Sequence, residues 1–160
     1  MISSYTLRHV LNNKPLIGKD LISRFSTDSI NTTANTRVFK LMGFIGLGHM
    51  GSKMVANFNK ESSSLLDNGI LIFDRDAQAI NKTIEISDYS NNVKPSRSVE
   101  DIANQCDVIF SMLPNDAVVD EISNSLINYS KGSGNKFIHI SCSTISPSTS
   151  RRLKVLIYQL

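Results

Sequence analysis

Apolar and polar residues alternate in blocks along residues 41–160 of this 160-residue chain. Short apolar runs predict buried β-strands at residues 41–45, 70–73, 93–96, 107–112 and 137–140. Apolar residues at helical spacing predict α-helices at residues 49–60, 77–85, 99–105, 117–128 and from 147 onward. Strands that alternate with helices in this way form a doubly wound parallel sheet with helices on both faces. We therefore predict an α/β fold whose ligands bind at the carboxyl ends of the strands.

Turn and capping signals agree with these boundaries. The Asn-Gly pair at residues 68–69 predicts a turn before the second strand, and Ser98 is a typical helix cap. Either Asn115 or Asp116 can cap the following helix. A flexible turn is expected to follow that helix at residues 132–135. On the helix at residues 117–128, the apolar stripe that faces the core is expected to consist of Val118, Ile122 and Leu126.

The turn after the first predicted strand carries glycines at the spacing G-x-G-x-x-G. A strand before the glycines and a helix after them favour a dinucleotide-binding turn over an ordinary glycine-rich loop. There the first glycine permits a tight bend, the second lets the main chain approach a pyrophosphate, and the third allows close helix–strand packing. The helix N-terminus adds unpaired N–H groups and a positive dipole end. We therefore predict a Rossmann-type NAD(P)-binding domain whose cofactor contacts residues Gly46, Leu47, Gly48, His49, Met50 and Gly51.

An acidic residue ends the second predicted strand. Asp74 follows Gly51 by 23 residues, close to the ~20 expected for the carboxylate that binds the adenosine ribose. A carboxylate there repels a 2′-phosphate, which favours NAD over NADP. Arg75 favours the opposite choice, because a guanidinium can pair with a 2′-phosphate or cover the adenine, although it can equally be a solvated surface charge. We predict NAD as the cofactor, with Asp74 and Arg75 at its adenosine end.

The first 38 residues differ in composition from the rest of the chain. They contain five basic residues and two acidic ones, and Ser, Thr and Asn are frequent among them. Their apolar residues can form short basic amphipathic turns, which is typical of a mitochondrial transit peptide. The alternative is a disordered polar extension. We expect residues 39–160 to form the dinucleotide-binding domain and the mature protein to lie in the mitochondrial matrix.

Charge and composition exclude several other classes. The net charge of +3 has its excess in the N-terminal stretch, and no basic and aromatic cluster indicates nucleic-acid binding. No apolar run approaches the ~20 residues that span a bilayer. Cys106 and Cys142 fall in or beside predicted core elements, and we expect both to be reduced, buried thiols. The three histidines lack metal-ligand spacing, so no metal site is expected.

Three segments, in order, resemble one known family. They read GFIGLGHMGSKMVAN (43–57), DVIFSMLPN (107–115) and ISCSTISPSTS (140–150). These segments are similar to the signature segments of the β-hydroxyacid dehydrogenases, and most similar to those of the members that oxidise 3-hydroxyisobutyrate. The resemblance covers about residues 41–153, nearly all of the predicted folded part.

This resemblance implies NAD-dependent oxidation of 3-hydroxyisobutyrate, a small 3-hydroxy acid, to methylmalonate semialdehyde in mitochondrial valine breakdown. It also implies that full-length relatives are homo-oligomers. Carried over to this chain, the glycines hold the pyrophosphate and Asp74 holds the ribose. Leu113 and Pro114 line the nicotinamide side of the cleft, while Thr144 contacts the cofactor near the nicotinamide. Ser143 helps to hold the substrate carboxylate. Considered alone, Ser143 and Thr144 also fit a capped loop before the last helix.

The chain departs from the family in two respects. Ser141-Cys142-Ser143 stands where Asp-Ser-Ser is usual, and we interpret Cys142 as a packing substitution because no paired base is evident. The family's catalytic lysine and its C-terminal helical domain are absent from these 160 residues, so we expect no catalytic residue here and little or no turnover. Two alternatives stay open. One is a non-catalytic NAD(P)-binding fragment, and the other is an NADPH-dependent glyoxylate or succinic semialdehyde reductase, which Arg75 would support.

Overall fold

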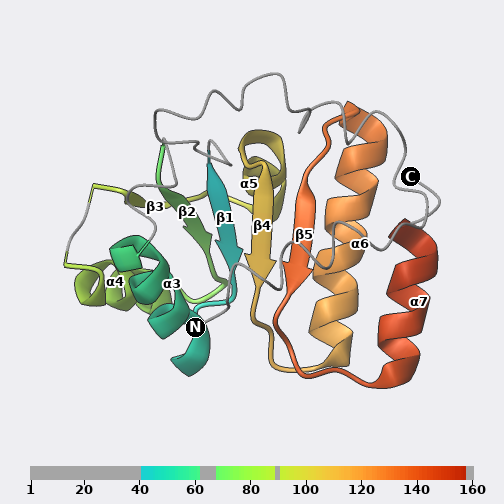
Figure 1. Ribbon diagram of the computed structural model, residues 1–160, viewed down its shortest axis with the longest axis horizontal. Coiled ribbons are helices and arrows are strands. Elements are labelled where there is room, and N and C mark those ends of the chain that lie inside the picture. Colours follow the sequence, from blue (N-terminus) through green and yellow to red (C-terminus); the bar gives the residue numbers. More distant parts are fainter. Residues whose placement is uncertain (1–40, 62–67, 89–90, 158–160) are drawn as a thin grey trace, which may run out of the picture. The chain divides into compact units, whose positions relative to one another are not determined.

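The computed structural model describes residues 41–61, 68–88 and 91–157, which form a parallel five-stranded sheet with helices on both faces (Figure 1). Its strands run in the order β3-β2-β1-β4-β5, so the chain moves outward from β1 to one edge and then crosses back to β4. The carboxyl ends of β1 and β4 therefore form the switch point at which such sheets bind ligands. The predicted fold class is confirmed. The strands are β1 (Met42–Ile45), β2 (Ile70–Phe73), β3 (Val93–Pro95), β4 (Val108–Ser111) and β5 (Ile138–Ser141).

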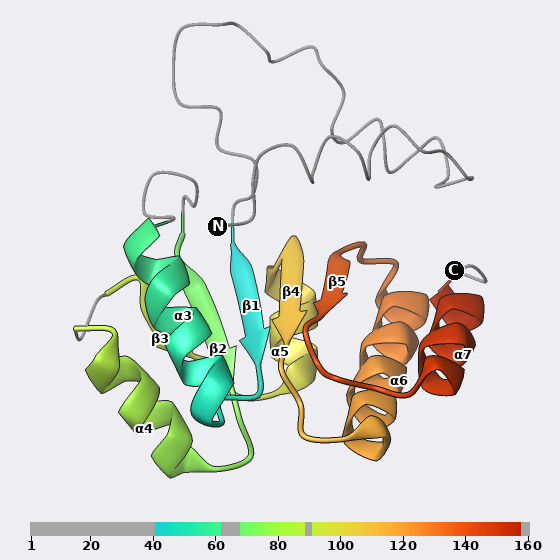
Figure 2. The same cartoon turned by 60° about the horizontal axis from the view of Figure 1, so that its bottom comes forward.

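Each strand leads into a helix. The helices are α3 (His49–Glu61), α4 (Ala77–Ile86), α5 (Val99–Gln105), α6 (Asp116–Ser133) and α7 (Pro147–Ile157). Helices α3 and α4 cover one face of the sheet, and α5 and α6 lie on the other (Figure 2). The predicted transit peptide lies outside the described residues, as do parts of the two loops that precede β2 and β3. No described helix is long and apolar enough to cross a membrane.

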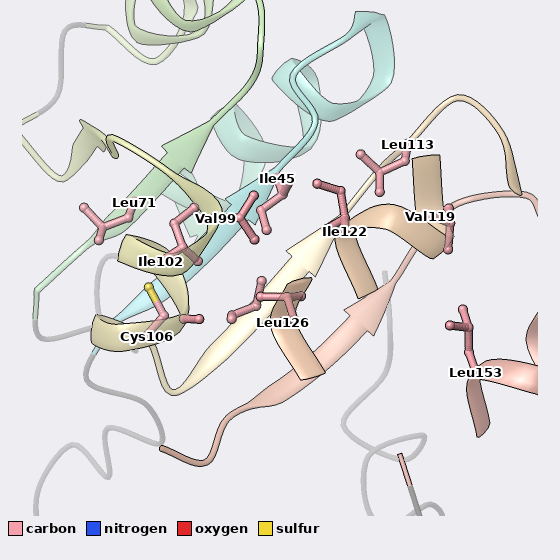
Figure 3. Close-up of a cluster of buried hydrophobic side chains, with 12 residues drawn as sticks. Ile45, Leu71, Val99, Ile102, Cys106, Leu113, Val119, Ile122, Leu126 and Leu153 are labelled. Atoms are coloured by element: carbon pink, nitrogen blue, oxygen red, sulfur yellow. The ribbon is translucent and has the colours of Figure 1, made fainter. Parts of the chain in front are cut away.

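Side chains that alternate along the strands build one core on each face of the sheet. On the α3/α4 face, Phe44 is fully buried and packs in a cluster with Val55 of α3. On the opposite face, Ile102 of α5 and Leu126 of α6 lie in a second cluster (Figure 3), to which Ile109 of β4 also belongs. Because helices cover both faces, the central strands read as continuous apolar runs, which is why the sequence predicted them well.

Side-chain caps fix the starts of three helices. Asp76, Ser98 and Asn115 each accept a hydrogen bond from a backbone N–H in the first turn of the helix that follows. Such caps satisfy amide groups that have no partner inside the helix. Of the two residues that the sequence offered as the cap of α6, Asn115 is therefore the cap, and the neighbouring Asp116 has a different partner.

Most strands and helices start and end within one residue of the predicted boundaries, and the largest difference is at the end of α6. Helix α6 ends at Ser133 instead of residue 128, because helical bonding continues until Gly134 adopts the left-handed conformation with φ of 72°. The predicted flexible turn at residues 132–135 is therefore wrong for its first two residues, which belong to the helix. Strand β5 begins at Ile138, one residue later than predicted.

Both cysteines are free thiols. Cys106 is buried in the core, and its burial raises the pKa of the thiol to about 12. Cys142 is only partly buried, less than expected, and burial also raises its pKa. Neither is a reactive thiolate near neutral pH. Within the described ranges, no group of three or more His, Cys, Asp or Glu side chains could hold a metal ion.

His139 predicts a pH dependence of stability. Its Nε2 shares a hydrogen bond of 2.9 Å with Ser111 Oγ, and burial lowers the pKa of His139 to about 4 from its usual 6.5. Because folding opposes protonation of this ring, its contribution is complete above pH 6.5 and is lost as the pH falls toward 4. Because His139 is only partly buried, the wild type should lose about 1–3 kcal/mol more unfolding free energy over this interval than His139→Gln. Urea unfolding across the interval measures the difference, and equal losses would contradict the prediction.

Candidate functional site

A cleft of about 490 Å³ opens at the carboxyl ends of β1, β2 and β4, at the switch point of the sheet. Its volume lies within the range of small-molecule and cofactor sites. A second hollow, of about 610 Å³, is lined by side chains of α4 alone and includes no strand end, so we place the candidate site in the first cleft. The residues that line the first cleft are Ile45, Gly46, Gly48, His49, Met50, Gly51, Phe73, Asp74, Arg75, Met112, Leu113, Pro114, Val118 and Ile122.

Gly46 makes the tight turn that joins β1 to α3. Its φ is +92°, in a region that side-chain-bearing residues rarely adopt. A Cβ added to Gly46 would lie 2.3 Å from the carbonyl oxygen of Met112, on the exit of β4. On the other side, the Gly46 N–H donates to the Phe73 carbonyl of β2 at 3.0 Å. The turn is held between the exits of both neighbouring strands, and only glycine fits there.

The other two glycines of the motif have contrasting surroundings. A Cβ on Gly51 would lie 2.0 Å from the carbonyl oxygen of Gly46, so α3 packs against the turn more closely than any side chain allows. A Cβ on Gly48 would meet no atom within 4 Å. The backbone of Gly48 thus borders open space in the cleft, where a ligand group can approach the main chain directly. This space leaves room for a pyrophosphate.

Helix α3 begins at this turn with amide groups that the helix does not use. Its first hydrogen bond runs from Ser52 N–H to the Gly48 carbonyl at 3.0 Å, which leaves the N–H groups of His49, Met50 and Gly51 without helical partners. No acidic side chain lies in the first turn of α3. The amide donors and the positive end of the helix dipole therefore favour an anion at this end of the cleft.

Asp74 directs its carboxylate toward the glycine turn. Oδ2 accepts a hydrogen bond from Leu47 N–H at 2.6 Å, and Oδ1 accepts one from Asp76 N–H at 2.9 Å. These bonds fix the position of the carboxylate, while lone pairs stay available for hydroxyl groups of a ligand. Leu47 acts here through its main chain, since its side chain is buried in the core beside α3.

Arg75 is not a solitary surface charge. Its guanidinium forms an ion pair with Glu121 of α6, and the two side chains are 65% and 55% exposed. Arg75 lines the cleft from the exit of β2, whereas α6 contributes lining residues from the exit of β4. The ion pair therefore joins two walls of the same cleft.

The apolar part of the cleft is continuous with the core. Ile45, Leu113 and Ile122 belong to the buried cluster on the α5/α6 face and also line the cleft (Figure 3). Of the stripe predicted for α6, Ile122 and Leu126 are buried as expected, whereas Val118 is partly buried and lines the cleft and the neighbouring Val119 is fully buried. Apolar walls of this kind accommodate the flat rings of a cofactor and exclude water.

The exit of β5 differs from expectation. Ser143 Oγ accepts a hydrogen bond from Leu113 N–H at 2.8 Å, and Thr144 is exposed. Neither residue lines the cleft, to which the exits of β1, β2 and β4 contribute. The Ser143 hydroxyl instead positions the main chain of the β4 exit. The contacts of Ser143 with substrate and of Thr144 with cofactor stay predictions.

Asp116 ties the starts of two helices together. Its carboxylate accepts hydrogen bonds from Ser146 N–H at 3.1 Å and from Thr149 Oγ1 at 3.0 Å, both at the start of α7. Hydrogen bonds from Ser146 and Thr149 lower the pKa of Asp116, so the carboxylate is ionised at neutral pH. This connection holds the loop that carries Ser143 beside the wall of the cleft.

Residues 41–158 match the family described as the NAD binding domain of 6-phosphogluconate dehydrogenase. The chain belongs to this family. Family members are NAD(P)-dependent oxidoreductases, and the sheet with its glycine turn is accordingly an NAD(P)-binding domain. The prediction of a Rossmann-type NAD(P)-binding domain is therefore confirmed.

Solved structures of longer proteins are similar to the chain. The 3-hydroxyisobutyrate dehydrogenase of Mycobacterium tuberculosis, with L-serine, has 24% identity and a TM-score of 0.61, over 75% of this chain and 37% of that one. A variant imine reductase from Myxococcus stipitatus in complex with NAD+ has 15% identity and a TM-score of 0.58, over 76% and 37%. The imine reductase from the same organism in complex with NADP+ has 15% identity and a TM-score of 0.60, over 74% and 37%. At these identities the similarity shows a shared fold. One of the imine reductase structures contains NAD+ and the other NADP+. The chain spans under two fifths of the length of these proteins.

Several residues of the site were not singled out from the sequence. Ile45 and Phe73 are the last residues of β1 and β2, so the rule that ligands bind at strand ends could have found them. Met112 lies at the exit of β4 and could have been found in the same way. Glu121 had no such signal, because its role depends on a partner 46 positions away.

Proposed function

We propose that this chain binds a nicotinamide adenine dinucleotide, with a preference for NAD, as the cofactor-binding part of a dehydrogenase for a small 3-hydroxy acid. One observation carries the proposal: the Asp74 carboxylate accepts the Leu47 N–H of the glycine turn at 2.6 Å. This contact brings an acid suited to a ribose next to a turn suited to a pyrophosphate, in one cleft.

The residues of the cleft divide into an anion-binding part and a hydroxyl-binding part. Open space at Gly48 and the amide groups at the start of α3 suit the pyrophosphate. The carboxylate of Asp74, fixed by two backbone N–H groups, would accept hydrogen bonds from the ribose hydroxyls. The same negative charge opposes a 2′-phosphate, which supports NAD over NADP.

The chemistry of the reaction would take place at the apolar end of the cleft. When bound, the nicotinamide supplies a hydride acceptor. Met112, Leu113 and Pro114 would cover one side of that ring and exclude water. The described residues that line the cleft include no lysine, and we propose that a base outside this domain takes the hydroxyl proton of the substrate.

The proposed substrate is 3-hydroxyisobutyrate, oxidised to methylmalonate semialdehyde. Three sequence segments that resemble the β-hydroxyacid dehydrogenases support it, as does the fold shared with the Mycobacterium tuberculosis enzyme of that name. We propose that Ser143 helps to hold the substrate carboxylate and that Thr144 contacts the cofactor once the rest of such an enzyme closes the cleft. By itself the chain is expected to show little or no turnover.

Titrating the purified chain with NADH and NADPH tests this function. We expect saturable binding in calorimetry and in nicotinamide fluorescence, with NADH the tighter ligand. Absence of saturable binding would refute the dinucleotide proposal, whereas tighter NADPH would refute the NAD preference. With NAD+ and 3-hydroxyisobutyrate we expect no formation of NADH, and its formation would show that this chain contains the base.

A second candidate function is NADPH-dependent reduction of glyoxylate or succinic semialdehyde. The observation that favours it is the guanidinium of Arg75 in the lining of the cleft, next to the proposed ribose site. Its pairing with Glu121 weakens this candidate, because one terminal nitrogen of the guanidinium is already engaged by a carboxylate. A non-catalytic dinucleotide-binding module would bind NADH and NADPH with the same affinities as the cofactor-binding part of a dehydrogenase. It would show no dehydrogenase activity when combined with the remaining domain of a homologous enzyme.

We also propose that the protein acts in the mitochondrial matrix and that its complete form is a homo-oligomer. The first proposal is supported by the basic, Ser- and Asn-rich composition of residues 1–38, and the second by the family resemblance. Fusing residues 1–38 to a fluorescent protein tests the first, and cytosolic fluorescence would contradict it.

A further inference from the structure

The ion pair between Arg75 and Glu121 lies at the proposed adenosine end of the cleft. Arg75 follows directly on Asp74, and both line the cleft. Glu121 follows Val118 by three positions on α6 and adjoins Ile122, and these two residues also line the cleft. Residues three apart on a helix share a face, so Glu121 stands at the rim of the cleft next to Val118. The pair connects opposite walls that are 46 positions apart in the sequence.

Arg75 is the group in this cleft that best suits a 2′-phosphate. Among the described residues of the lining it is the only arginine, and none is a lysine. Asp74, one position earlier, is placed to contact the ribose that would carry this phosphate. A guanidinium pairs with phosphate through the same planar donors that it offers to a carboxylate. Glu121 therefore engages one of the terminal guanidinium nitrogens with which Arg75 would bind a 2′-phosphate.

We infer that Glu121 is a specificity-determining residue that selects NAD against NADP by holding the Arg75 guanidinium. The inference rests on the proposed dinucleotide function and deepens it. Two effects act in the same direction. NADPH must displace Glu121 from Arg75, and its 2′-phosphate then lies near the carboxylates of both Asp74 and Glu121, where like charges repel. NADH carries no such phosphate and leaves the ion pair intact.

The exposure of the pair sets the size of the effect. With side chains that are 65% and 55% exposed, the pair is screened by water and salt. Exposed ion pairs change equilibria by about twofold to fivefold. The resulting preference is moderate, and a single substitution that removes the charge of Glu121 should relax it.

The neighbouring residue on α6 provides a matched control. Asp120 forms an ion pair with Arg152 of α7 and does not line the cleft. Glu121→Gln and Asp120→Asn each remove one negative charge and one ion pair from the same turn of the helix. The two variants therefore raise the net charge equally but differ in whether the pair lies at the cleft.

Calorimetric titration of both variants and the wild type with NADH and NADPH tests the inference. Glu121→Gln should raise the affinity for NADPH about twofold to fivefold and change that for NADH by less than about twofold. Asp120→Asn should leave the ratio of the two affinities unchanged. Adding Arg75→Gln to Glu121→Gln should abolish the gain, because the freed guanidinium is the cause.

Several results would overturn the inference. An equal NADPH gain in Asp120→Asn would show a general effect of net charge, and a gain that survives Arg75→Gln would exclude the guanidinium. An unchanged NADPH affinity in Glu121→Gln would also refute it. If the wild type bound NADH and Glu121→Gln bound NADPH no more tightly than the wild type does, only this inference would fail. If it bound neither dinucleotide, the proposed function would fail as well.

Discussion

Replacing Gly51 with alanine should cost this domain both stability and cofactor binding. The new Cβ would lie 2.0 Å from the carbonyl oxygen of Gly46, which is backbone and cannot swing away. Helix α3 would have to move off the turn, and overpacking of this kind costs about 1–3 kcal/mol. The displaced helix would also withdraw the N–H groups of His49 and Met50 from the proposed pyrophosphate site. We therefore expect the affinity for NADH to fall at least about tenfold.

Urea unfolding and NADH titration measure these two effects separately. Gly132→Ala is the control for stability, because a Cβ at this exposed position in the last turn of α6 would meet no atom within 4 Å. It should stabilise the fold by up to about 1 kcal/mol and leave binding unchanged. Gly48→Ala should weaken NADH binding while changing stability by less than about 0.5 kcal/mol, because its methyl group would enter only the open space. A Gly51→Ala variant as stable as the wild type would contradict the close packing of α3.

The second large effect is expected at Asp74. Asp74→Ala removes the acceptor of the Leu47 N–H and, in the proposed complex, the acceptor of the ribose hydroxyls. Hydrogen bonds to charged groups contribute about 1.5–3 kcal/mol each, so the affinity for NADH should fall about tenfold to a hundredfold. NADPH should lose less, because the same carboxylate opposes its 2′-phosphate. The preference for NADH over NADPH should therefore narrow.

Asp76→Ala is the matched control for this prediction. Asp76 is a nearby carboxylate that caps α4 by accepting the Gln78 N–H at 2.8 Å. Its removal should cost about 0.5–2 kcal/mol of stability without changing the affinity for NADH. Calorimetric titration of Asp74→Ala, Asp76→Ala and the wild type with NADH and NADPH measures these affinities. If NADH binds Asp74→Ala as tightly as it binds the wild type, or if Asp76→Ala shows the same loss, Asp74 does not bind the ribose.

Much of the fold could be predicted because it depends on residues that are close in sequence. The caps at Ser98 and Asn115 follow from backbone groups within a few positions, and the turn at Gly46 follows from the spacing of the glycines. The place of Asp74 beside the glycine turn could also be predicted, since neighbouring parallel strands end at the same edge of the sheet.

The predictions failed where the outcome depended on the phase of a helix or on distant partners. Each residue turns an α-helix by about 100°, so the neighbours Val118 and Val119 face different directions, and Val119 rather than Val118 is the fully buried residue at the start of the α6 stripe. The bond between the Ser143 hydroxyl and Leu113 N–H, thirty positions away, could not be predicted either, and the contact of Ser143 with a substrate stays a prediction. Polar groups of this kind have many possible partners, and a sequence does not distinguish among them.

The order of the strands and helices, the glycine turn and the acid that follows β2 can all be read from the amino-acid sequence. Backbone sterics and apolar periodicity are local properties, so they can be read along the chain. Only the tertiary structure decided that Arg75 meets Glu121 and that Asp116 holds the start of α7. These partners are 46 and 30 positions apart, and they meet because the strand order β2-β1-β4-β5 brings α6 to the cleft and places α7 beside it.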